Sequence, residues 1–414
     1  MNAGTQRSGR YQTWLVFLLS LNFGIVFFDR NATNFLMPFI QPDLGFSNKE
    51  VGFVSAALSL TWAISGFVVG GLSDRMGVKK PVVVVATVLF CACSFVSGAA
   101  TSFLMLLGAR LLMGVAEGGI MPISHSMIVN EVSPERRGLA MGVGQNLGSN
   151  LLGSFVAPLV LVWIATHWGW REGFYMAAVP GLFTAALIWF TLREPPKDAP
   201  HETHEKVTLK QAFANRNVRL CAAISVLLVS YLVVTWAFMP LYLTKVRGVD
   251  PDTMGWLMAT LGVSAGVGSF VVPAISDAIG RRPVLVFFSF LGVILPLGAL
   301  FYAGSAWVLA AIFFFGWGLN GVFPLFMATI PAESVDPRLA ATLTGIVMGL
   351  GEVLGGVFSP ILAGAAADQW GLTAPLWIML GLTIAAGMLA LGLVESAPRI
   401  VARRGTAPAA PMPG

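Results

Sequence analysis

Long apolar runs dominate this sequence and leave few folds open to it. Each run is about 20 residues, enough to cross the hydrocarbon core of a bilayer as a helix. Only helices and closed barrels can satisfy their backbone in lipid, and continuous rather than alternating runs favour helices. We predict an all-α membrane protein with about twelve transmembrane helices, at residues 14–40, 51–73, 82–100, 102–128, 138–165, 171–193, 219–243, 253–276, 283–303, 305–330, 339–365 and 372–395.

Composition supports the membrane assignment and excludes several other classes. Hydrophobic residues make up 56% of the chain and charged residues 11%, whereas soluble domains average about 25% charged residues. The first apolar run is too long and too charged for a cleavable signal peptide. The three cysteines lie in apolar runs at spacings that predict neither a disulfide framework nor a metal site. We expect no cofactor, no metal and no nucleic-acid partner.

Basic residues collect in alternate loops, which predicts the orientation of the chain. The loops before the first predicted helix, after the second and after the fourth are basic, as are the segment 193–218 and the tail. Cytoplasmic loops carry the excess of Lys and Arg in membrane proteins. We therefore expect a multi-pass protein of the cell inner (plasma) membrane, with both termini in the cytoplasm.

The two halves of the chain repeat each other at a shift of about 202 residues. The stretch "LSDRMGVKKPVVV" (72–84) aligns with "ISDAIGRRPVLV" (275–286), and Trp168-Gly169 aligns with Trp370-Gly371. We predict two pseudo-symmetric six-helix bundles at 1–192 and 219–396, a cytoplasmic linker at 193–218 and a disordered cytoplasmic tail at 397–414. Paired repeats of this kind occur in secondary transporters, whose solute site lies at the repeat interface.

The stretch "GGLSDRMGVKK" (70–80) resembles the loop between helices 2 and 3 in the major facilitator superfamily. The resemblance covers the whole apolar region and implies a monomer. It also implies that a set of residues at the helix ends, most of them charged, forms a gating latch between conformations. The alternative is a solvated charge cluster that only sets topology. The residues concerned are Gly70, Asp74, Arg75, Gly77, Lys79, Lys80, Glu131, Arg136, Asp277, Arg281, Glu333 and Arg338.

Five ionisable residues lie inside predicted helices: Asp29, Arg30, Arg110, Glu117 and Glu352. A charge at the bilayer centre costs several kcal/mol on most scales, so each is a candidate for function. Arg110 and Glu117 are nearly two helical turns apart and face the same way. Asp29 and Arg30 are adjacent and diverge by about 100°, so one can face a cavity while the other contacts a neighbouring helix.

Three segments resemble one branch of that superfamily, the anion:cation symporters. They are "FDR" (28–30), "ARLLMGVAEGG" (109–119) and "GWREGFY" (169–175). The resemblance implies that Arg30 and Arg110 bind a substrate carboxylate and that Asp29 and Glu117 exchange the coupling protons. The structural alternatives are a structural pair or a snorkelling arginine for Asp29 and Arg30, and a fixed helix-packing salt bridge for Arg110 and Glu117. A guanidinium offers a carboxylate two parallel hydrogen bonds, and burial favours the protonated form of an acid. The substrate would be a small organic anion, with sugar acids favoured over aromatic or dicarboxylic acids.

Other polar residues of the predicted helices are weaker candidates. Glu352 is assigned to proton coupling, with a basic substrate group or a structural ion pair as alternatives. Gln145, Asn146, Tyr231 and Asn320 are predicted to bind substrate hydroxyls, although each is also suited to helix–helix contacts. Trp62 and Trp236 are candidates for the cavity wall.

Three rival functions remain open at this point. A facilitator or symporter of neutral solutes would not need two arginines in the membrane. The drug/proton antiporter branch carries a Gly-Pro motif on its fifth helix. The corresponding stretch of this chain, "GSNLLGSFVAP" (148–158), has no Gly-Pro. A transporter-like sensor would carry a longer cytoplasmic segment. No catalytic motif supports an enzyme.

Overall fold

The computed structural model describes residues 8–144, 148–195 and 213–403 and is built of helices. Within these residues, twelve helices are long and apolar enough to cross a membrane, as predicted. The first half contains α1 (Gly9–Leu44), α2 (Asn48–Met76), α3 (Lys80–Gly98), α4 (Phe103–Gly118), α5 (Ile120–Glu131), α6 (Pro134–Gly142), η2 (Ser149–Val156), α7 (Ala157–His167) and α8 (Trp170–Thr191).

The second half repeats this order. It contains α10 (Arg216–Lys245), α11 (Pro251–Ile279), α12 (Arg281–Leu291), α13 (Ile294–Phe301), α14 (Ala306–Trp317), η3 (Gly318–Val322), η4 (Leu325–Thr329), α15 (Ile330–Glu333), α16 (Pro337–Leu350), η5 (Gly351–Phe358), α17 (Ser359–Trp370), α18 (Ala374–Leu391) and the short α19 (Pro398–Arg403). Several of these are consecutive pieces of one span, such as α12 and α13 or α4 and α5.

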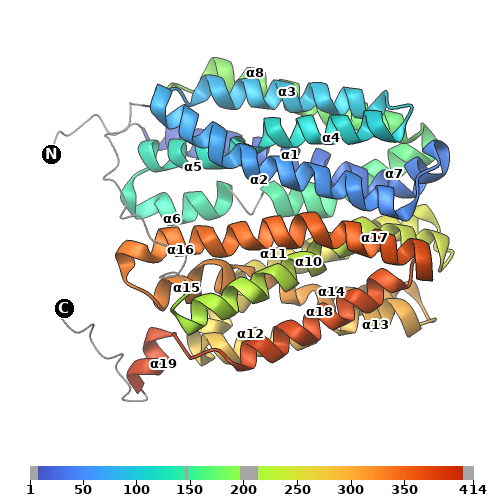
Figure 1. Ribbon diagram of the computed structural model, residues 1–414. Coiled ribbons are helices and arrows are strands. Elements are labelled where there is room, and N and C mark those ends of the chain that lie inside the picture. The colour runs from blue at the N-terminus through green and yellow to red at the C-terminus, as the bar shows by residue number, and fades with distance from the viewer. Residues whose placement is uncertain (1–7, 145–147, 196–212, 404–414) are drawn as a thin grey trace.

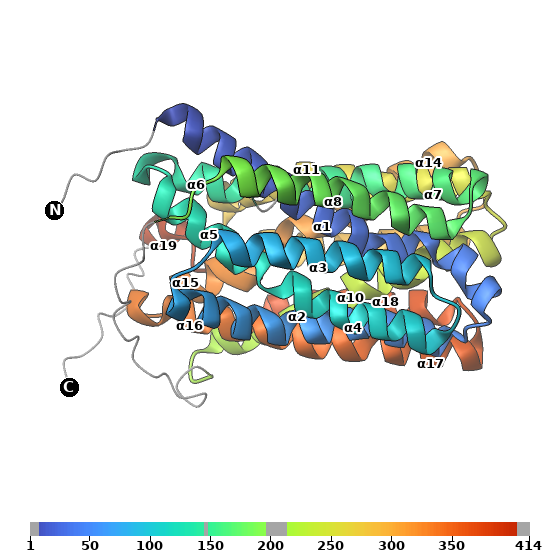
Figure 2. The ribbon, with the colours of Figure 1, turned by 90° about the horizontal axis from the view of Figure 1, so that it is seen from above.

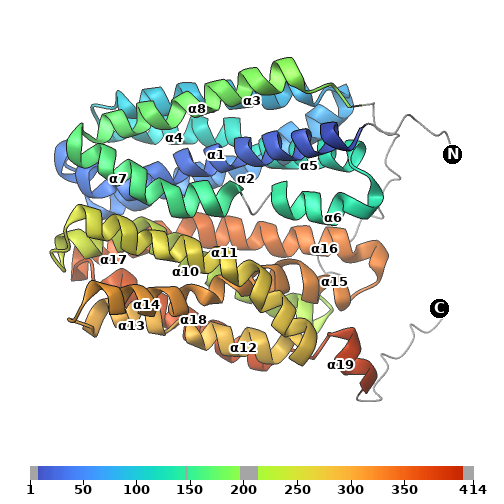
Figure 3. The ribbon, with the colours of Figure 1, turned by 180° about the vertical axis from the view of Figure 1, so that it is seen from behind.

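The halves lie side by side as two bundles whose helix axes are roughly aligned, with successive spans running in opposite directions (Figures 1 and 3). We call the end where α1 begins and α18 ends the near end. The far end is where α1 ends and α2 begins. Seen from above, α1 and α10 lie inside the molecule, while α3 and α8 lie on its outer side (Figure 2). This arrangement matches the predicted pair of six-helix bundles.

Glycines and hydrogen bonds close the far end between the two halves. A Cβ on Gly52 would lie 2.2 Å from the carbonyl oxygen of Pro360, and one on Gly262 would lie 2.4 Å from Ser154. Backbone this close leaves no room for a side chain. Asp368 of α17 accepts hydrogen bonds from the backbone N–H groups of Asn48 (2.8 Å) and Lys49 (3.0 Å) at the start of α2.

A second polar contact joins the halves at the far end. Lys245, at the end of α10, donates to Gln41 Oε1 of α1 at 2.5 Å. Gln41 is itself held by the bonds that its amide nitrogen donates to Phe46 O (3.1 Å) and Asn48 Oδ1 (3.0 Å). The contact therefore links the ends of α1 and α10 to the turn before α2.

The fifth and eleventh spans contain matched π-helical stretches, η2 and η5, which lie 202 residues apart along the chain. Each is followed by a proline, Pro158 or Pro360, which has no N–H to donate. In π-helical register Pro158 would pair with the carbonyl of Gly153. That carbonyl instead accepts a hydrogen bond from Asn31 Nδ2 at 2.9 Å. The sequence had predicted plain helices over 138–165 and 339–365.

In each half, a glutamate carboxylate caps the start of the third span. Glu194 accepts from the backbone N–H groups of Lys79 and Lys80, at the start of α3. Glu395 accepts in the same way from Arg281 (2.8 Å) and Arg282 (3.1 Å), at the start of α12. A negative charge is favourable at a helix N-terminus, where backbone donors have no helical partner. Each cap ties the near end of a bundle's sixth helix to its third.

The boundaries differ from the predicted ones at several points. The first helix spans Gly9–Leu44, longer at both ends than 14–40. Pro398–Arg403 forms α19, inside the tail that was predicted to be disordered. Residues 196–212 of the predicted linker and 404–414 of the predicted tail lie outside the described residues.

Candidate functional site

A cavity of about 310 Å³ lies between the two halves, on the near-end side of the far-end contacts. Its aromatic wall includes both predicted tryptophans, Trp62 and Trp236, together with Phe27 and Phe323. Polar side chains from both bundles share the lining: Arg30, Asn31, Thr33, Asn34, Ser55, Ser59, Arg110, Ser149, Asn150, Ser154, Asn320 and Glu352. The lining thus brings together residues from α1, α2, α4, η2, α10, η3 and η5.

Arg30 extends from α1 into this cavity. Its guanidinium carbon lies 5.1 Å from the ring centre of Trp62 and 5.5 Å from that of Phe27. Stacking on aromatic faces is favourable for a guanidinium and leaves its N–H edges free to bind. The side chain is therefore held against aromatic neighbours at the cavity wall.

Asp29 points the other way, as the helical rotation between adjacent residues requires. Its side chain is fully buried. Its Oδ1 accepts a hydrogen bond from Ser94 of α3 at 2.8 Å, and Ser94 Oγ also lies 3.0 Å from the carbonyl oxygen of Phe174. Within the described residues Asp29 Oδ2 has no hydrogen-bond partner. The acid is thus placed behind the cavity wall rather than in it.

Arg110 and Glu117 lie on one face of α4 and are both 1% exposed. Arg110 lines the cavity, stacks over Phe174 at 4.9 Å and donates to Met113 Sδ at 3.1 Å. Its Nε and Nη2 donate no hydrogen bond to any described residue, and neither oxygen of Glu117 accepts one. A fixed Arg110–Glu117 salt bridge, the structural alternative, is therefore not formed in this conformation.

The remaining predicted site residues divide into two groups. Glu352, on η5, and Asn320, on η3, line the cavity from the second half. Tyr231 does not: its hydroxyl donates to the carbonyl of Gly292 at 3.0 Å and its ring stacks on Trp317, 5.9 Å between centres. Gln145 and Asn146 lie outside the described residues.

Sequence reasoning missed two contacts of the charged residues. Ser94, the hydrogen-bond donor to Asp29, lies in an apolar helix, and no sequence motif singles it out. Phe174 contacts the site twice, through its ring against Arg110 and its carbonyl beside Ser94. It lies in "GWREGFY" (169–175), one of the three segments that carry the resemblance.

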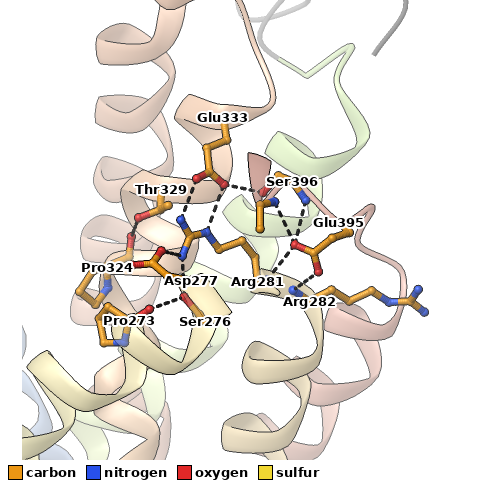
Figure 4. A network of polar contacts seen from close by, with 11 residues as sticks. Pro273, Ser276, Asp277, Arg281, Arg282, Pro324, Thr329, Glu333, Glu395 and Ser396 are labelled. Carbon is orange, nitrogen blue, oxygen red and sulfur yellow. Dashed lines mark hydrogen bonds and ion pairs between the residues drawn. The ribbon is translucent and has the colours of Figure 1, made fainter. Parts of the chain in front are cut away.

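Three of the predicted latch residues of the second half, Asp277, Arg281 and Glu333, meet at the near end (Figure 4). Arg281 contacts Glu333 through Nη2 (2.9 Å) and Nε (3.2 Å), and Asp277 through Nη1 (2.5 Å). Ser276 Oγ accepts a further bond from Nη1 at 2.6 Å. These contacts join α11, α12 and α15 within one bundle. The side chain of Arg338 is not among those described.

The first-half latch residues have a different geometry. Gly77 ends α2 in the left-handed conformation (φ 66°), and Gly70 packs against Pro122. Lys79 is buried and bonds to Ser126, while Lys80 donates to the carbonyls of Trp189 (2.8 Å) and Leu192 (2.9 Å). Glu131 is buried, Arg75 and Arg136 are exposed, and the side chain of Asp74 is not described.

Two repeated bundles enclosing a charged cavity at their interface define a secondary-transporter architecture. The family model of the Major Facilitator Superfamily matches residues 19–248 and 232–412. The chain belongs to the Major Facilitator Superfamily, and it is a multi-pass membrane protein of the transporter class and not an enzyme.

Two named relatives of the chain are transporters of hexuronate and of D-galactonate. It is 29% identical over 382 residues to the hexuronate transporter of Bacillus subtilis, covering 86% of this chain and 88% of that protein. It is 23% identical over 442 residues to the D-galactonate transporter of Escherichia coli O6:H1, covering 97% and 99%. These names agree with the anion:cation symporter branch to which the sequence motifs point.

Solved structures confirm the fold. A bacterial homologue of the human lysosomal transporter Spinster, in an inward-facing and occupied conformation, superposes with a TM-score of 0.78 at 18% identity, covering 93% of this chain and 97% of that one. A D-xylose–proton symporter gives a TM-score of 0.74 at 18% identity, covering 94% and 98%.

Proposed function

We propose that this protein takes up a small organic carboxylate together with protons by alternating access, and that sugar acids are its preferred substrates. The observation that carries the proposal is the pair of arginines at the cavity, Arg30 and Arg110. Arg110 is almost fully buried yet has two donor nitrogens without a partner among the described residues. A buried cation is costly unless it is paired, and a bound carboxylate supplies that pairing.

Asp29 and Glu117 are suited to carry the coupling protons. Both are buried beside the arginines, and the charge of Arg110 interacts with both acids. A carboxylate that binds Arg110 weakens its attraction for these acids and so favours their protonation. Substrate and proton then bind cooperatively: the bound carboxylate neutralises the arginine charge, and protonation neutralises the acid charge that the arginine had balanced.

The charge distribution supports an orientation with the near end in the cytoplasm of a cell inner membrane. Arg75, Lys80 and Arg136 are at the near end, whereas the far end has fewer basic residues. With this orientation the far-end contacts close the outside, and the conformation is inward-facing. The latch residues at the near end would then re-pair when the cytoplasmic side closes, and the chain would work as a monomer.

An aromatic acid is the second candidate substrate. Trp62, Trp236 and Phe27 provide flat apolar walls next to Arg30, and these would stack on a ring.

The test is proton uptake by the full-length protein in liposomes that contain a pH-sensitive dye. Galactonate, glucuronate, tartrate, phthalate and 4-hydroxybenzoate are added in turn, with glucose as the neutral control. We expect internal acidification with at least one acid, and its loss in Glu117→Gln. Acidification with glucose alone would contradict the proposal.

Arg30→Lys tests the substrate contact itself. A lysine keeps the charge but loses the planar fork that binds both carboxylate oxygens. We expect the variant to insert normally and to lose about tenfold or more in uptake. Arg399→Lys, at an exposed position in α19, is the matched control and should behave as wild type. Wild-type uptake by Arg30→Lys would show that Arg30 does not hold the substrate.

A further inference from the structure

The cavity has charges of opposite sign on its two walls. Arg30 and Arg110 are the basic residues of the lining and both come from the first half, whereas Glu352 is an acid contributed by the second half. Sequence reasoning grouped Glu352 with Asp29 and Glu117. The structure separates them, because Asp29 and Glu117 lie behind the wall while Glu352 is part of the lining and only half-buried.

The local backbone places Glu352 at the cavity. It is the second residue of η5, and its repeat counterpart on η2 is Asn150, which lines the cavity from the first half. A Cβ on Gly356 would lie 3.6 Å from both Glu352 Oε2 and Ser59 Cβ. The carboxylate therefore sits beside α2 of the other half, at the seam between the bundles.

Glu352 has no basic partner at contact distance. Arg30 interacts with it electrostatically, but the described residues form no direct ion pair between the two. A substrate carboxylate that binds the arginines takes up the positive charge that would otherwise balance Glu352. With the substrate carboxylate bound, the negative charge of Glu352 in the same enclosed space is unfavourable unless a hydrogen-bond donor or positive group of the substrate pairs with it.

We propose that Glu352 is a specificity-determining residue: it accepts a hydrogen bond from a hydroxyl or ammonium group at the end of the substrate opposite the carboxylate. The inference rests on the proposed function, since it takes the anion to be bound by Arg30 and Arg110. It defines the substrate class more narrowly, as carboxylates with a distal hydrogen-bond donor. Simple fatty or aromatic monocarboxylates without such a donor bind weakly.

Three carboxylates of equal chain length test the proposal: hexanoate, its terminal-amino derivative and gluconate. Binding to the purified full-length protein is followed by intrinsic fluorescence, because Trp62 and Trp236 line the cavity. We expect wild type to bind the amino derivative or gluconate at least about tenfold more tightly than hexanoate, since a polar site rejects a ligand that leaves it unpaired. Which of the two binds more tightly identifies the donor as ammonium or hydroxyl.

Glu352→Gln removes the charge and keeps the shape. We expect this variant to bind hexanoate more tightly than wild type does, and the preference for a distal donor to fall several-fold. Asp252→Asn, an exposed acid at the start of α11, is the control and should keep the wild-type ratio. Glu352→Asp keeps the charge and should keep the direction of the preference.

Three results would overturn the inference. The first is equal binding of all three acids by wild type, which decides the question even if Glu352→Gln does not fold. The second is a preference that survives unchanged in Glu352→Gln. The third is that Glu352→Gln changes the affinity for all three acids equally and in a pH-dependent way, which would make Glu352 a proton site. Failure of the proposed function is distinct, because wild type would then bind none of these acids and none of the transport panel.

Discussion

Asp368→Ala should shift the protein away from the conformation in which the far end is closed. Asp368 joins α17 to the start of α2, and its two hydrogen bonds, at 2.8 and 3.0 Å, cross between the halves. Each such bond contributes about 0.5–1.5 kcal/mol net. Because the site is exposed, we take the lower part of that range, or about 1–2 kcal/mol for the pair. That energy changes the ratio of far-end-closed to far-end-open molecules by about 5- to 30-fold.

The ratio can be measured as a distance distribution between spin labels on cysteines introduced at Thr166 and Ser305. These are exposed residues at the far ends of the two halves. We expect a longer-distance population in Asp368→Ala that is weak or missing in wild type. Labelling is done in lipid nanodiscs, with the label pair carried by every variant.

Ser47→Ala is the matched control for this experiment. Ser47 accepts a hydrogen bond from the Glu50 N–H at 3.2 Å and so caps the same helix, α2, from within its own half. Its removal weakens the cap equally in both conformations and should leave the distances unchanged. Unchanged distances in Asp368→Ala, or an equal shift in both variants, would refute the reasoning.

Three further variants test other parts of the structure. Gly52→Val should also open the far end in the same distance measurement, because a Cβ there meets a carbonyl oxygen of the other half at 2.2 Å; Gly266→Val, with open space around its Cβ position, should not. Arg281→Met should lower the free energy of unfolding by about 1–3 kcal/mol, mainly because the partly buried Glu333 loses its cation, whereas the exposed Asp277 contributes little. Thermal unfolding in detergent measures this, with the exposed Arg75→Met as control, and an equal loss in both would contradict it. Asn31→Ala should cost about 1–3 kcal/mol by leaving a buried carbonyl without its donor, and an unchanged midpoint would show that the carbonyl is satisfied otherwise.

Much of the fold could be predicted from apolar run length, the internal repeat and helix geometry. Each membrane span needs a minimum apolar length, so the twelve helices could be counted and their ends placed within several residues. The repeat placed Asp277, Arg281 and Glu333 among the residues at the helix ends, but the ion pairs that Arg281 forms with both acids were not predicted. The divergence of Asp29 and Arg30 follows from helix rotation alone.

The parts that could not be predicted depend on partners distant in the chain. The π-helical stretch before Pro158 needs Asn31, more than a hundred residues earlier, to bond the carbonyl that the proline leaves. Tyr231 is in a span that lines the cavity, but its hydroxyl donates to the carbonyl of Gly292, between α12 and α13, instead. Neither outcome has a local sequence signal, because both are set by which helices become neighbours.

The paired carboxylate caps suggest how this scaffold can be re-engineered. Glu194 and Glu395 perform the same task in both bundles, whereas Arg30, Arg110 and Glu352 have no charged counterpart in the opposite repeat. The framework is therefore duplicated and the chemistry of the cavity is not. A library of variants confined to the lining could change the cargo while leaving the caps, and hence the assembly of each bundle, as they are.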